Sequence, residues 1–240
     1  LYVFINLIND GVDINNYKIS SKQKKDYAKK DLFIYNGLIE KERNLAIDLL
    51  SINPNLKIID AAYVLETDYS PEELWLNPSS LLMMAQNVRL GLQEYITSSY
   101  LKKEVDANYD GLKVELSELD AKYRVDVENT DNKTIVVANS ALKYLEKFGI
   151  EVICIDNDAT AKTLSVVNKL IEDKAISYVT IFKNDKLPDN AKKIISEHSE
   201  IKESKLHKLD NISDEDRSEG RDYISIMEDN LEIIKQELYQ

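Results

Sequence analysis

Short apolar runs alternate with longer amphipathic stretches along most of the chain. The runs are rich in Ile, Val and Tyr, which favours β-strands over helices at this length. Because helix-length segments separate the runs, the expected strands should pair in parallel within an α/β fold. The predicted strands cover residues 32–35, 56–60, 134–138, 151–155 and 178–182.

Three helices are predicted from apolar residues that recur at steps of three and four. The first begins at Asn77-Pro78, a capping residue followed by proline at the first helical position. In each helix these residues form an apolar stripe along one face, and such stripes are typical of core faces rather than of ligand sites. They consist of Leu81, Met84, Val88, Leu92 and Tyr95; of Tyr109, Leu112, Leu116, Leu119 and Tyr123; and of Ile224, Met227, Leu231, Ile234 and Leu238.

The second stripe lies in a charged, proline-free segment between the two groups of strands. This position predicts a helix, residues 105–128, that joins two lobes. We assign residues 1–104 to the N-terminal lobe and residues 129–240 to the C-terminal lobe. A chain of 240 residues is long enough for two separate cores.

Composition narrows the class of protein. The chain has 31 Lys and Arg against 43 Asp and Glu, a formal net charge of −12, so a nucleic acid backbone would be repelled. No apolar run approaches the length of a membrane-spanning helix.

The sequence opens at Leu1 without methionine. We therefore expect a processed or shortened N-terminus, with any export signal or lipid-anchor cysteine in the part removed.

Motifs for bond chemistry are missing from the sequence. It has six glycines and neither a dinucleotide-binding fingerprint nor a P-loop. His198 and His207 fall outside zinc- and serine-hydrolase motifs. Cys154, the only cysteine, lies in an apolar run, where an inert thiol is expected. The lysines of residues 21–30 either form a basic patch for an acidic partner or, as we favour, a solvated helix face.

Four segments in order resemble the metal receptors of bacterial ABC importers, the cluster A-I solute-binding proteins. Together they cover nearly the whole chain, and the block around Trp75 is the most specific of them. The segments are GVDINNY at 11–17 with KDLFIYNGL at 30–38, ELWLNP at 73–78 with the helix that follows it, VANSALKYLEKFGI at 137–150, and LDNI at 209–212 with YISIMEDNL at 223–231.

This resemblance implies two α/β lobes joined by a rigid helix, with the ligand in the cleft between them. It also implies a lipid-anchored or periplasmic protein, expected to be a monomer, that delivers its cargo to an ABC permease. In the family, two histidines, a histidine or glutamate, and an acid hold the cation. The matching positions here are Asn15, Glu73, Asn139 and Asp210, so only Asp210 is a residue expected at its place.

The four residues offer oxygen ligands alone, which favours manganese over zinc as the divalent cargo. Each also has a structural explanation. Ser70 and Glu73 have the spacing of a capping box, Asn139 stands where a helix cap would, and Asn15 and Asp210 lie in turn-like sequence. In the family register, however, all four fall at strand-to-helix turns that line one crevice, where open α/β sheets bind ligands.

The leading hypothesis is therefore a non-enzymatic receptor that binds a divalent cation for an ABC importer. A second hypothesis is a degenerate relative that has lost the metal and binds another small solute or acts as a surface interaction protein. An enzyme that uses Cys154 or a pair of carboxylates is a third, and no acid-base constellation supports it.

Overall fold

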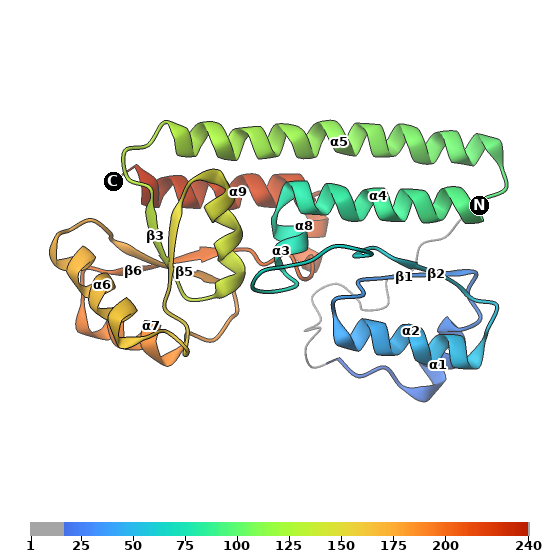
Figure 1. Cartoon of the computed structure of the whole chain (residues 1–240), viewed down its shortest axis with the longest axis horizontal. Coiled ribbons are helices and arrows are strands. Elements are labelled where there is room, and N and C mark those ends of the chain that lie inside the picture. The colour runs from blue at the N-terminus through green and yellow to red at the C-terminus, as the bar shows by residue number, and fades with distance from the viewer. Residues whose placement is uncertain (1–16, 240) are drawn as a thin grey trace.

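The structure is a computed structural model that describes residues 17–239. Two α/β lobes lie side by side beneath a layer of long helices (Figure 1). Both sheets are parallel throughout. The predicted fold class, two lobes with short parallel sheets flanked by helices, is confirmed.

From residue 17 onward, the N-terminal lobe contributes a two-stranded sheet. β1 (Leu32–Tyr35) and β2 (Lys57–Asp60) pair in parallel, in register Leu32 to Lys57. Helices α1 (Ser21–Tyr27) and α2 (Glu40–Ile52) belong to the same lobe, and α2 buries Leu45, Ala46 and Leu49. α1 has no buried residue, and its Lys24 pairs with Asp48 of α2, so the solvated lysine face stays a prediction.

The C-terminal lobe holds a four-stranded sheet in the order β4-β3-β5-β6. Helices connect its successive strands, because parallel strands cannot be joined by a tight turn and usually need a helical crossover. Gly149 ends the first of them with φ of +92°, a left-handed conformation that favours glycine. The elements are β3 (Thr134–Val137), the 3₁₀ helix η1 (Ser140–Phe148), β4 (Glu151–Cys154), α6 (Ala161–Glu172), β5 (Tyr178–Phe182), α7 (Asp189–Glu197) and β6 (Lys202–Leu206).

The strand β6 is the one strand of the described chain that the apolar pattern did not predict. Its sequence, KESKL, buries only Ser204 and Leu206. An edge strand with charged residues toward solvent gives little hydrophobic signal. The five predicted strands are all present, with ends that agree to within one residue.

A long helical layer covers both lobes (Figure 1). α5 (Ser99–Glu128) has 30 residues and so extends roughly 45 Å. It contains the whole of the interval 105–128 predicted as the linking helix, whereas the lobe boundaries on either side stay predictions. The other helices here are α3 (Glu73–Leu76), α4 (Pro78–Tyr95), α8 (Asp214–Ser218) and α9 (Tyr223–Leu238).

The start of α4 confirms the predicted cap. The Asn77 side chain accepts a hydrogen bond from the backbone N–H of Ser79 at 3.1 Å, and Pro78 occupies the first turn. Farther along, Gly91 lies so close to β2 that a Cβ there would come within 2.6 Å of Ile59 Cδ1. Any larger residue at this position would require the Ile59 side chain to move. In residues 17–239, no helix combines the length and apolar character that a membrane span requires.

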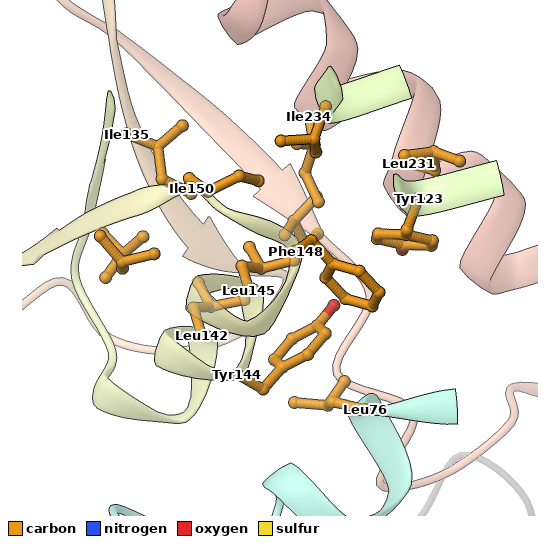
Figure 2. Close-up of a cluster of buried hydrophobic side chains, with 14 of the residues drawn as sticks. Leu76, Tyr123, Ile135, Leu142, Tyr144, Leu145, Phe148, Ile150, Leu231 and Ile234 are labelled. Carbon is orange, nitrogen blue, oxygen red and sulfur yellow. The ribbon is translucent and has the colours of Figure 1, made fainter. Parts of the chain in front are cut away.

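The two lobes share one apolar junction (Figure 2). Leu76 of α3 is fully buried among residues of the C-terminal lobe, and the Tyr123 ring of α5 packs at a tilt against Phe148 of η1 with ring centroids 5.0 Å apart. The Tyr123 hydroxyl donates to the carbonyl of Met227 in α9 at 3.0 Å. The core thus runs continuously through α3, α5, η1 and α9.

Candidate functional site

Glu73 lies at the first turn of α3, where the N-terminal lobe meets the C-terminal lobe. Its Oε1 accepts hydrogen bonds from the backbone N–H groups of Tyr69 at 2.7 Å and Ser70 at 2.6 Å. Oε2 lies 3.4 Å from the N–H of Asp68. The carboxylate therefore caps its own turn, as the Ser70–Glu73 spacing suggested.

Asn139 follows β3 and caps η1. Its Oδ1 accepts from the N–H of Ala141 at 2.9 Å. Its Nδ2 donates to Asp185 Oδ2 at 3.2 Å. One end of the amide is thus structural, while the other reaches a carboxylate that follows β5.

Asp210 lies in the turn after β6. It follows Leu209, which has a left-handed φ of +57°, an uncommon conformation for a side chain of this size. Asp210 is also close to His207. Burial lowers the pKa of His207, and the carboxylates of Asp216 and Asp210 partly oppose this shift.

The His207 imidazole is held in place by its surroundings. Nδ1 accepts from the N–H of Leu209 at 2.9 Å, and Nε2 lies 3.6 Å from Asp216 Oδ2. Asn230 fixes the backbone, because its Oδ1 accepts from the His207 N–H at 2.7 Å and its Nδ2 donates to the His207 carbonyl at 2.9 Å. The ring therefore supports the turn that carries Asp210.

The fourth predicted residue, Asn15, lies outside the described residues. No hydrogen bond directly joins Glu73, Asn139 and Asp210 in the described chain, although their segments meet. Between residues 17 and 239, no three His, Cys, Asp or Glu side chains are grouped so that they could hold a metal ion. The predicted set as a whole stays a prediction.

A lysine that the sequence did not single out lies where these segments meet. The ammonium of Lys208 is 3.6 Å from Glu72 Oε1 and 3.7 Å from Asp185 Oδ1. The Trp75 indole N–H donates to the Lys208 carbonyl at 3.0 Å. Glu72, Asp185 and Lys208 thus form a three-charge bridge across the junction, and Asn139 extends it through Asp185.

The sequence held only a partial signal for this bridge. Glu72 is the neighbour of Glu73, and Lys208 stands two residues before Asp210. Asp185, by contrast, lies in a loop after β5 that no motif marked. Its role follows from the parallel sheet, which brings the loops after β3, β5 and β6 to one edge.

A second ion pair closes the junction beside α5. Lys147 Nζ lies 2.9 Å from Asp120 Oδ1, 2.6 Å from Asn77 Oδ1 and 2.9 Å from Ser79 Oγ. Burial lowers the pKa of Lys147, while its hydrogen bond with Asp120 opposes the shift. This network pins η1 to the start of α4 and to the middle of α5.

Cys154 has no nucleophilic character in this setting. Burial raises the pKa of its thiol to about 11, so almost none is thiolate at neutral pH. Its Sγ contacts Asp156 Oδ2 at 3.4 Å, and a nearby carboxylate further disfavours the thiolate. The expectation of an inert cysteine agrees with this environment.

These features define a two-lobed α/β protein with a cluster of charged side chains where the lobes meet. Within that class, the chain belongs to the family described as zinc-uptake complex component A, periplasmic (ZnuA), whose family model matches residues 3–237. The resemblance seen in the sequence is thereby confirmed.

Individual relatives are distant in sequence. The chain is 21% identical over 255 residues to the zinc-binding lipoprotein AdcA of Streptococcus pneumoniae, covering 96% of this chain and 50% of AdcA. It is 22% identical over 173 residues to the high-affinity zinc uptake system protein ZnuA of Bacillus subtilis, covering 69% and 52%. The chain thus spans about half the length of these curated relatives.

Among solved structures, the chain is similar to the Zn(II)-bound ZnuA-like domain of Streptococcus pneumoniae AdcA. The TM-score is 0.75 at 23% identity, and the match covers 98% of this chain and 90% of the other. The metal-dependent lipoprotein YcdH of Bacillus subtilis gives a TM-score of 0.78 at 19% identity. At these identities, the likeness establishes the fold.

Proposed function

We propose that this chain is the solute-binding component of an ABC importer and that it binds a divalent cation between its lobes without catalysing a reaction. Family membership supports the receptor role, and AdcA and ZnuA are named for zinc. The observation that carries the proposal is the convergence of the Glu73, Asn139 and Asp210 segments on one charged junction.

The ligand chemistry favours manganese over zinc. Asn15, Glu73, Asn139 and Asp210, the proposed ligands, offer oxygen atoms, as do the nearby carboxylates of Glu72 and Asp185. Oxygen donors suit manganese, whereas zinc sites are usually built with imidazole or thiolate. The His207 ring is engaged in its own turn. We therefore expect modest affinity and poor selectivity for zinc.

The same proposal includes location and partners. A receptor of this kind works outside the cytoplasm, held at the cell surface by a lipid anchor or free in the periplasm, and passes its cargo to a membrane permease. We expect it to act as a monomer. The net charge of −12 suits attraction of cations and opposes contact with nucleic acid.

Isothermal titration of metal-stripped protein with manganese, zinc, calcium and iron tests the cargo. We expect saturable heat with manganese at micromolar protein and no tighter binding of zinc. Asp210→Asn should weaken manganese binding about tenfold, since a charged ligand becomes neutral. Asp214→Asn, an exposed acid in the first turn of α8, should leave the affinity unchanged. No heat with any of the four metals would remove the cation assignment.

Two observations favour a second candidate function, a relative that keeps the scaffold and has lost the cation. The Glu73 carboxylate is engaged by its own turn, and a lysine ammonium lies at the junction. Such a protein would bind another small solute or a surface partner. An isothermal titration that gives no binding heat with any of the metals, together with a melting temperature that a chelator leaves unchanged, would favour this candidate.

A further inference from the structure

Lys208 is an internal cation at the junction of the lobes. Its side chain is 13% exposed, and its ammonium lies 5.8 Å from the centroid of the Phe182 ring. A buried lysine requires paired charges to offset the loss of hydration. The two partners that supply them, Glu72 and Asp185, are 27% and 32% exposed.

The two carboxylates come from opposite sides of the junction. Glu72 precedes α3, whereas Asp185 follows β5 in the C-terminal lobe. Their oxygens lie 3.6 and 3.7 Å from the same nitrogen. The ammonium thus takes the place that a bridging cation would take between two acids.

The backbone of Lys208 is fixed as well as its head group. The Trp75 indole holds its carbonyl at 3.0 Å, and the left-handed Leu209 follows it directly. The anchored backbone limits the lysine to motions of its own side chain. A cation that enters between Glu72 and Asp185 must therefore displace the ammonium or remain close to it, where like charges repel.

We propose that Lys208 is a built-in competitor that sets the affinity of the junction for divalent cations, an inference that rests on the proposed cation-binding function. In the metal-free protein, the single positive charge of Lys208 partly offsets the two negative charges of Glu72 and Asp185. Cargo binding exchanges this tethered monovalent cation for a free divalent one. The observed affinity is therefore reduced by the free energy needed to move the ammonium away.

The test compares manganese binding by the metal-stripped full chain and its Lys208 variants in isothermal titration. Lys208→Met and Lys208→Gln remove the competing charge at similar length and should bind manganese at least tenfold more tightly than the unmodified chain. Lys208→Arg keeps the positive charge and should bind manganese no more tightly than the unmodified chain. Lys205→Met, at an exposed lysine of β6 that pairs with Glu203, is the matched control and should leave the affinity unchanged.

Thermal unfolding with and without manganese gives a second readout. Lys208→Met removes the ammonium that faces both carboxylates, so without metal it should melt lower than the unmodified chain, and its melting temperature should rise more on addition of manganese. If the variant melts lower and its melting temperature does not rise with manganese, Lys208 has a purely structural role and the proposal is overturned.

The outcomes separate this inference from the proposed function. If the unmodified chain binds manganese and the neutral variants bind no more tightly, the competitor role is wrong and the receptor function stands. If only the neutral variants bind, Lys208 blocks the site and the unmodified chain does not carry manganese. Absence of binding in every variant removes both proposals.

Discussion

At the scale of single residues, neighbouring carboxylates have different tasks. Glu73 accepts backbone hydrogen bonds from its own turn, whereas the adjacent Glu72 faces Lys208. The sequence pointed to Glu73 as a candidate ligand and did not mark Glu72. Their directions depend on a turn whose geometry is set by hydrogen bonds rather than by apolar periodicity.

The capping role of Glu73 leads to a stability prediction. Glu73→Ala should lower the free energy of unfolding by about 1–2 kcal/mol, the usual cost of losing a capping side chain. Glu73→Gln, which keeps one acceptor oxygen, should lose less. Urea denaturation measures both. An alanine variant as stable as the unmodified chain would contradict the capping role.

A second residue-scale prediction concerns Glu237, which is buried where α9 packs against the four-stranded sheet. Thr180 Oγ1 donates to its carboxyl group at 2.8 Å, yet burial raises the pKa of Glu237 from 4.5 to about 7. The folded protein therefore holds this proton more tightly than the unfolded chain does. Its contribution to stability is complete below pH 4.5 and is lost as the pH rises through about 7.

The effect is measured by urea denaturation of the unmodified chain and Glu237→Gln between pH 4 and pH 8. A shift of this size corresponds to on the order of 3 kcal/mol. The unmodified chain should lose that much relative to the glutamine variant across the range. Parallel pH profiles of the two proteins would show that Glu237 titrates normally.

At the scale of secondary-structure elements, most of the fold followed from periodicity. The five predicted strands and the three long helices are present because each has a strong apolar pattern. β6 was missed because only Ser204 and Leu206 of its five residues are buried. The apolar stripe on α4 was predicted as a core face, and α4 lies against both α5 and β2.

The short helix α3 contributes more to stability than its length suggests. It is a single turn of four residues, yet Leu76 is fully buried in the core of the C-terminal lobe (Figure 2). Leu76→Ala should lower the free energy of unfolding by about 2–5 kcal/mol. Leu90→Ala, at a position of α4 that is 53% exposed, should change it by less than about 0.5 kcal/mol. Equal effects of the two substitutions, measured by urea denaturation, would contradict this packing.

At the scale of the whole molecule, the site is assembled from distant parts of the sequence. Trp75 and Lys208 are 133 residues apart along the chain but are hydrogen bonded. The family pattern predicted that their segments meet, whereas nothing in the sequence indicated that an ammonium would lie between Glu72 and Asp185. Such a bridge depends on how the loops of two lobes face each other across the junction.

The central claim is that a divalent cation binds at this junction of the lobes. Anomalous diffraction at the manganese edge, from crystals grown with manganese chloride, tests it most directly. We predict a single strong peak between the Glu72–Glu73 turn and the turn that carries Asp210, with the Lys208 ammonium moved away from Asp185. No peak at the junction, or manganese bound only to acids on the outer surface, would contradict the account.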